Sequence, residues 1–194
     1  DHIMAIAAVD LAHRGLLRNK GVAVTVMTNL GFHHTMRDNN IDVVITPVGD
    51  RSILVALDEF DFVLGGEQSG HVIHRAHATT GDGLLAALQL VEYITRARVT
   101  LDQAASIMQS YPQILVNIRT LNRVHDPVHD IAEQIARAEA ELGDNGRILV
   151  RSSGTEPLVR VMVEAADQVT AESIAIRVAQ AVVGIHGGSI EGTH

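Results

Sequence analysis

Apolar residues in the first half of the chain alternate between helical and strand-like spacing. Helical spacing predicts helices over residues 3–15, 30–39 and 84–96, with a short amphipathic stretch at 53–57, and apolar β-forming runs predict strands over residues 22–27, 42–46 and 62–64. Asp82 is placed to cap the last of these helices. Thr100 and Gln103 form a capping-box pattern, which predicts one more helix that extends to about residue 110. The alternation predicts an α/β domain over residues 1–111, with a mixed sheet covered by helices.

The pattern changes at Pro112, because proline disfavours helix in the residue before it. Strands are predicted over residues 113–119, 147–152 and 158–165, and helices over residues 127–142 and 170–181, with Thr170 as the cap of the second helix. The order β-α-β-β-α predicts a small α+β domain over residues 112–194, an antiparallel sheet with helices on one face. The Gly-rich tail, residues 184–194, has little to bury and is expected to be disordered.

Composition narrows the possible partners. Hydrophobic residues make up 46% of the chain but aromatic residues only 3%, so the cores must be aliphatic. Fifteen Lys and Arg against 23 Asp and Glu give a net charge of −8, which disfavours nucleic acid and anionic membranes as partners. A small anionic substrate would therefore need a local cluster of arginines.

Cysteine is absent from the sequence, which excludes disulfides, thiolate nucleophiles and cysteine zinc sites and fits a cytoplasmic protein. No apolar run approaches the ~20 residues of a membrane helix. The chain begins with Asp1 and lacks a signal-peptide pattern, so we expect it to start within a longer protein.

Residues 151–157, Arg-Ser-Ser-Gly-Thr-Glu-Pro, form the strongest candidate site, together with Arg160. Hydroxyl groups, a glycine and two guanidinium groups between two predicted strands are suited to gripping a phosphate dianion. Ser, Gly, Thr and Pro are also ordinary turn residues, so spacing alone favours a plain hydrophilic turn.

Residues 65–71, Gly-Gly-Glu-Gln-Ser-Gly-His, form a second candidate after a predicted strand. A carboxylate, an amide, a hydroxyl and an imidazole between glycines suit a loop that hydrogen-bonds neighbouring sugar hydroxyls. The alternative is a flexible glycine turn. The glycine spacing does not match a dinucleotide-binding loop.

These two strings, in this order, resemble the sugar-recognition loop and the phosphate-binding loop of the α-D-phosphohexomutases. Residues 28–32, 46–51 and 79–83 are similar to further segments of that family's third domain, so the resemblance covers almost the whole chain. Gln68 is similar to the phosphoglucosamine mutase branch, whereas the phosphomannomutase/phosphoglucomutase branch often has Met at that position.

The resemblance implies that the chain is the third and fourth domains of a four-domain enzyme. It assigns sugar hydroxyls to Glu67, Ser69 and His71, and a phosphate to Arg151, Ser152, Ser153, Gly154, Thr155 and Arg160. The family's catalytic phosphoserine and its D-G-D-x-D-R magnesium loop belong to the first two domains, and residues 49–51 are only a partial match to that loop. We therefore expect no catalytic residue and no metal ligand here, and no activity from this chain alone.

For the parent enzyme, the resemblance implies the interconversion of glucosamine 6-phosphate and glucosamine 1-phosphate. Mg²⁺ and glucosamine 1,6-bisphosphate are the implied cofactors, the two N-terminal domains and the hexosamine phosphate are the implied partners, and a homodimer is possible. The alternatives are a phosphomannomutase/phosphoglucomutase fragment and a phosphosugar-binding or structural module without catalysis. Eleven histidines also raise a metal hypothesis, but His71, His74 and His77 converge poorly on either a strand or a helix.

Overall fold

The computed structural model describes residues 1–193, which divide into two compact units at Ser110 and Tyr111. This division differs by one residue from the boundary between residues 111 and 112 that the sequence pattern predicts. Each unit has its own four-stranded sheet.

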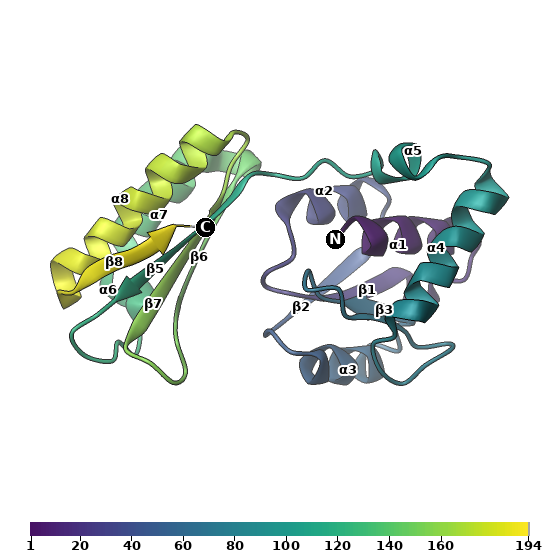
Figure 1. Ribbon diagram of the computed structural model, residues 1–194, viewed down its shortest axis with the longest axis horizontal. Helices are drawn as coiled ribbons and strands as arrows, with labels where there is room; N and C mark the ends of the chain where they lie inside the picture. The colour runs from purple at the N-terminus through teal and green to yellow at the C-terminus, as the bar shows by residue number, and fades with distance from the viewer. Residues whose placement is uncertain (194) are drawn as a thin grey trace. The chain divides into compact units, whose positions relative to one another are not determined.

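The first unit is built around a mixed sheet with the strand order β2-β1-β3-β4 (Figure 1). Strand β1 is parallel to β2 and β3, and β4 is antiparallel to β3, which confirms the predicted mixed sheet. The elements in chain order are α1 His2–His13, η1 Arg18–Lys20, β1 Gly21–Thr25, α2 Leu30–Asp38, β2 Asp42–Thr46, α3 Asp50–Glu59, β3 Leu64–Gly66, β4 Val72–His74, α4 Gly83–Ala97 and α5 Leu101–Ala105.

Helices cover both faces of this sheet. All five residues of β1 are buried, as expected for a central parallel strand. Val22 and Val24 pack with residues of α1 and α2, whereas Ala23 packs with Ile53 of α3 on the opposite face. Figure 1 shows α1 and α2 on one side of the strands and α3 on the other.

The structure differs from several local predictions for this unit; the strand predicted over residues 62–64, for example, is β3 at Leu64–Gly66. The capping box at Thr100 is present, but the helix ends at Ala105 instead of residue 110. The sequence does not predict strand β4, because its three residues are too few to show a periodic pattern. The strand forms by pairing with β3. The cap by Asp82, whose side chain accepts from Leu85 N, is confirmed.

The second unit has an antiparallel sheet with the order β6-β7-β5-β8, which confirms the predicted fold class. The elements in chain order are β5 Gln113–Arg119, α6 Pro127–Asp130, α7 Ala132–Leu142, η2 Gly143–Asn145, β6 Arg147–Ser152, β7 Leu158–Glu164, α8 Gln168–His186 and β8 Ser189–Thr193. The last helix is capped by Asp167, which accepts from Thr170 N, so Thr170 is the third helical residue and not the cap.

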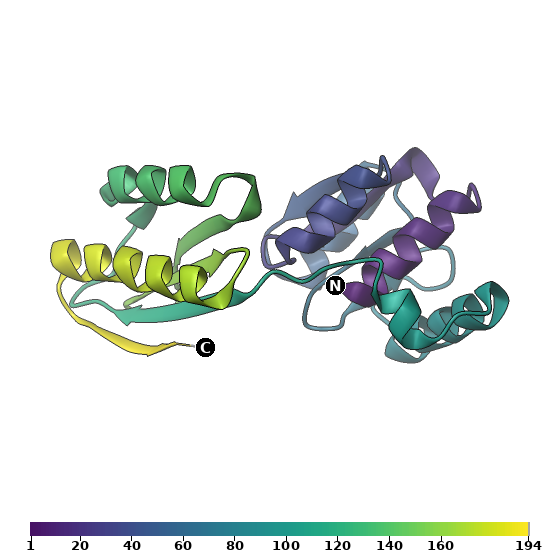
Figure 2. The same ribbon diagram turned by 90° about the horizontal axis from the view of Figure 1, so that it is seen from above.

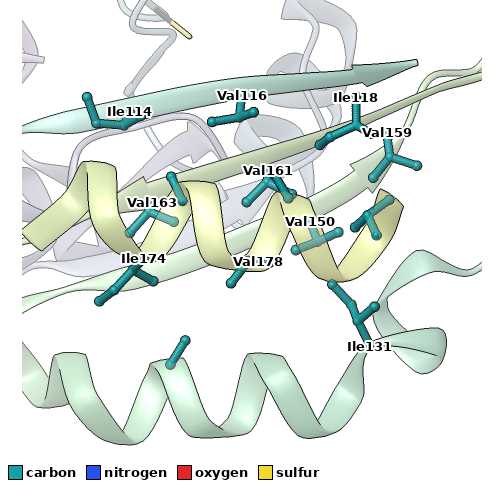
Figure 3. Packing of buried hydrophobic residues seen from close by; sticks show 14 of the residues in the cluster. Ile114, Val116, Ile118, Ile131, Val150, Val159, Val161, Val163, Ile174 and Val178 are labelled. Atoms are coloured by element: carbon teal, nitrogen blue, oxygen red, sulfur yellow. The ribbon is translucent and has the colours of Figure 1, made fainter. Parts of the chain in front are cut away.

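Alternate residues of the three longer strands build the core of this unit. Val116, Val161 and Val150 point toward the helices and pack with Ile174 and Val178 of α8 (Figure 3). Helix α7 contributes Ala138 and Leu142 to the same cluster. The residues between them on the strands therefore lie on the face without helices.

The prediction of a disordered tail is wrong for its described residues. Helix α8 continues to His186, and residues 189–193 form β8, which pairs antiparallel with β5. Of the predicted tail, only His194 lies outside the described residues. Figure 2 shows this yellow strand running back along the teal β5. The tail is ordered because it pairs with β5, which would otherwise have an unpaired edge. Backbone hydrogen bonds form this pairing, so the tail does not need a hydrophobic sequence.

Candidate functional site

The loop of residues 65–71 joins β3 to β4 in the first unit. Its backbone closes on itself, since Glu67 N donates to His71 O at 2.9 Å and Gly70 N donates to Glu67 O at 3.0 Å. Gly70 has a φ of +101°, which side-chain-bearing residues rarely adopt. The loop is thus a closed turn that presents its side chains at the end of the sheet.

Glu67, Ser69 and His71 lie together in this loop. The Oε1 atom of Glu67, a residue with 9% exposure, accepts from Gly49 N at 2.9 Å. Its Oε2 atom lies 3.4 Å from His71 Nδ1, and Ser69 Oγ lies 3.2 Å from the same nitrogen. The carboxylate is oriented by the backbone on one side and meets the imidazole on the other.

An open hollow of about 270 Å³ lies beside this loop, lined in part by Thr25, Val48, Glu67 and Ser69. It is located where the parallel strands β1 and β3 end, the edge at which α/β sheets commonly bind ligands. His71 is not among its lining residues. The backbone N–H of Gly49, which orients Glu67, is a functional group that the sequence does not indicate, because the two residues are 18 positions apart.

Arg151 and Arg160 lie directly opposite each other on β6 and β7. Both point away from the helices, because their neighbours Val150, Val159 and Val161 belong to the helix-side core. Within residues 1–193, neither guanidinium group has a hydrogen bond or ion pair. Partial burial, and then the nearby charge of Arg160, lower the pKa of Arg151. An anion bound here would relieve this uncompensated positive charge.

The hydroxyl groups of the loop between β6 and β7 have other arrangements. Ser152 lies on the opposite side of its strand, where its Oγ donates to Val124 O at 2.5 Å. Ser153 Oγ accepts from Thr155 N at 3.5 Å and from Glu156 N at 3.4 Å, which shapes the turn around Gly154. The structure thus places the Ser152 hydroxyl apart from the two arginines.

Arg123 supports the phosphate-loop candidate in a way the sequence did not indicate. Its Nη2 donates to Thr155 O at 2.6 Å. The contact spans 32 positions along the chain, so no local pattern could have revealed it.

The described residues do not fit a magnesium or other metal site. No group of three or more His, Cys or acidic side chains among them converges on a common point. Asp50, the one aspartate in the partial match to the family's metal loop, accepts from Arg51 N at 2.8 Å.

Among the described residues, no helix is both long and apolar enough to cross a bilayer.

The family model for the phosphoglucomutase/phosphomannomutase alpha/beta/alpha domain III matches residues 1–111, and the model for the C-terminal domain of the same proteins matches residues 115–181. The chain belongs to the phosphoglucomutase/phosphomannomutase family. It comprises that family's domain III and its C-terminal domain, and the predicted resemblance is confirmed.

Several members of the phosphoglucomutase/phosphomannomutase family are about half identical to this chain. A phosphoglucosamine mutase of Clavibacter michiganensis is 53% identical over 175 residues, which cover 89% of the chain and 40% of that protein. A phosphoglucosamine mutase of Frankia alni is 52% identical over 183 residues, covering 94% of the chain and 40% of that protein. The chain thus spans about 40% of the length of the curated relatives it matches.

Solved structures of the family share the fold. N-acetylphosphoglucosamine mutase of Aspergillus fumigatus superimposes with a TM-score of 0.76 at 23% identity, over 94% of this chain and 42% of that one. A structure of the same fungal enzyme in complex with GlcNAc-6P and magnesium gives a TM-score of 0.73 at 20% identity, over 97% and 44% of the two chains.

Proposed function

We propose that this chain supplies sugar and phosphate recognition to a phosphoglucosamine mutase, which interconverts glucosamine 6-phosphate and glucosamine 1-phosphate. The observation that carries the proposal is the pair Arg151 and Arg160, two neighbouring guanidinium groups without an acidic partner in the described residues of a chain with a net charge of −8. The names of the bacterial relatives support the choice of an amino sugar. Amino-sugar metabolism leading to peptidoglycan, in the cytoplasm, is the proposed setting.

In the proposed reaction, a phosphoserine donates its phosphoryl group to the hexosamine monophosphate, and the resulting bisphosphate turns over before the other phosphate returns to the serine. The substrate must therefore be accepted in two orientations. Arg151 and Arg160, with the backbone and hydroxyls of residues 153–155, hold the phosphate that is not reacting. Glu67, Ser69 and His71 bind ring hydroxyls, and the partly buried hydrogen bond from Gly49 N to Glu67 orients the carboxylate of Glu67.

The phosphoserine and the magnesium loop are proposed to come from other segments of the parent protein, since no residue of this chain is assigned to either role. Magnesium would stabilise negative charge on the transferred phosphoryl group. The role proposed for this chain is positioning, which holds the sugar in line for attack. By itself, the chain is expected to bind substrate without turning it over.

Binding by the isolated chain should be weak. Hydrogen bonds to charged groups contribute roughly 1.5–3 kcal/mol each, while association costs about 4–15 kcal/mol. A few such bonds exceed this cost only slightly, so we expect a Kd for glucosamine 6-phosphate in about the millimolar range.

An NMR titration with glucosamine 6-phosphate tests the assignment. Arg160→Ala should weaken binding about tenfold or more, because a charge-assisted contact is lost. Arg137→Ala is the matched control, because Arg137 is exposed on α7 and pairs with Glu133. Equal affinity of Arg160→Ala and the parent chain would refute the phosphate-loop assignment.

The substrate and the catalytic role require the complete protein. A coupled assay comparing glucosamine and mannose phosphates should show a preference for the amino sugar. A preference for mannose or glucose phosphates would indicate the phosphomannomutase/phosphoglucomutase branch. Substrate binding without turnover by the complete protein would indicate a phosphosugar-binding module.

A further inference from the structure

The face of the second sheet without helices carries a row of polar side chains across its strands. Arg151 of β6 lies opposite Arg160 of β7, and Arg160 lies opposite Asn117 of β5. Asn117 shares their face because its neighbours Val116 and Ile118 both belong to the helix-side core. Opposite residues on paired strands have Cβ atoms about 4.5–5.5 Å apart, so the three side chains are contiguous.

An open hollow of about 310 Å³ lies at the β5 end of this row. Asn117, Arg119 and Arg160 line it, together with the carboxylates of Glu156 and Glu191. An anion held by Arg160 at this hollow therefore has two further donors within the same wall, the amide of Asn117 and the guanidinium of Arg119.

Arg119 is already engaged. It pairs with Glu191 of β8, and this hydrogen bond, aided by the charge of Glu156, raises the pKa of Arg119. The same contact lowers the pKa of Glu191. An anion could bind Arg119 only by displacing Glu191. The loss of that ion pair would offset most of the binding free energy gained.

Unlike Arg119, Asn117 is free to donate a hydrogen bond to an anion. Its side chain is half-buried and forms no hydrogen bond within residues 1–193. An amide group in this state has already lost part of its contact with water, so a hydrogen bond to an anion adds free energy at little further desolvation cost.

We propose that Asn117 is a further phosphate-binding residue outside the loop, which donates its side-chain amide to the phosphate ester held by Arg151 and Arg160. The inference rests on the proposed function and extends it from the loop at 151–160 to the neighbouring strand β5. Because Glu191 already pairs with Arg119, the side chains proposed to reach the phosphate from the strands are Arg151, Arg160 and Asn117.

The test is an NMR titration of the 194-residue chain with glucosamine 6-phosphate. Asn117→Ala should weaken binding about two- to tenfold, the equivalent of one net hydrogen bond. Asn117→Asp has nearly the same shape but places a carboxylate beside the dianion, so it should weaken binding more than the alanine variant. A merely structural role of Asn117 would not produce this order. Asn145→Ala, in the exposed turn before β6, is the matched control and should bind like the parent chain.

Two further variants separate the possible failures. If Arg160→Ala weakens binding and both Asn117 variants bind like the parent chain, this inference is wrong and the proposed function stands. If Arg160→Ala also binds normally, the proposed function fails as well. A several-fold gain in affinity for Glu191→Gln, with no effect of the Asn117 substitutions, would identify Arg119 and not Asn117 as the additional donor and would overturn the proposal.

Discussion

Four arginines on one face of the second sheet differ in what surrounds them. Arg147 forms an ion pair with Glu164, which is fully buried, at 2.5 Å, and Arg119 pairs with Glu191. Arg151 and Arg160 lie between these pairs with no acidic partner in the described residues. The capacity to bind an anion therefore depends on which guanidinium groups the fold leaves unpaired, and the net charge of the chain does not reveal it.

His74 on β4 is a second residue whose environment sets its behaviour. Its exposure is 5%, and its Nε2 atom has no hydrogen-bond partner among residues 1–193. Burial, and then the nearby His77, lower the pKa of His74 below its ordinary value of about 6.5. Asp10, Gln89 and Tyr93 line the same small hollow between α1 and α4.

This shift predicts a loss of stability in mild acid. The unfolded chain takes up a proton near pH 6.5 while the folded chain resists it, so His74 contributes stability above about pH 6.5 that is lost as the pH falls toward the folded pKa. The parent chain should lose more free energy of unfolding between pH 7.5 and 5.5 than His74→Gln, as measured by urea denaturation. His77→Gln, at an exposed position, should behave nearly like the parent. Equal losses in the parent and His74→Gln would contradict the prediction.

Strand β8 illustrates how an element can form with little sequence signal. Its backbone pairs with residues 116–119 of β5 after a tight turn at Gly187 and Gly188. Gly188 has a φ of +100°, and a Cβ atom there would lie 1.9 Å from Arg119 O. The turn is therefore possible only with glycine at this position.

Gly188→Ala should release β8 from the sheet. The strained φ and the clash with backbone together should lower the free energy of unfolding by about 2 kcal/mol. Hydrogen exchange of the amides of residues 116–119 should become faster where they pair with β8. Gly184→Ala is the matched control: it lies in an open part of α8 and should stabilise the helix by about 0.5–1 kcal/mol. Unchanged protection of β5 in Gly188→Ala would show that β8 does not depend on this turn.

The whole molecule consists of two units, each with a core of its own. Val22 and Phe32 belong to one hydrophobic cluster of the first unit, and Val161 and Ile174 belong to the cluster of the second. Each unit also contains all the strands of its own sheet. A domain that buries its own core and pairs its own strands can fold independently.

We therefore predict that residues 1–110 and residues 111–194 fold as separate fragments. Each should give a dispersed NMR spectrum and a cooperative unfolding transition. The second fragment should retain the phosphate-loop resonances of the full chain. A fragment that becomes ordered only when the other is added would contradict the independence of the two cores.

Local sequence patterns determined much of the fold. The apolar stripes of α4 and α7, the capping box at Thr100 and the β-branched runs of β1 and β7 identify elements by short-range periodicity, because each pattern reports which face will be buried. The two loops could be recognised by their residues, since both candidate sites are continuous in sequence.

Tertiary structure decided what continuous patterns cannot encode. The tail forms a strand because it pairs with the edge of β5. Ser152 faces the helix layer because successive residues of a strand point to opposite faces, and Arg151 points to the other face. Asn117 lies opposite Arg160 only because β5 pairs with β7, two strands that are far apart in the sequence. Pairing between distant strands depends on the packing of the whole sheet, so the neighbours of the phosphate-binding candidate emerge only once the chain has folded.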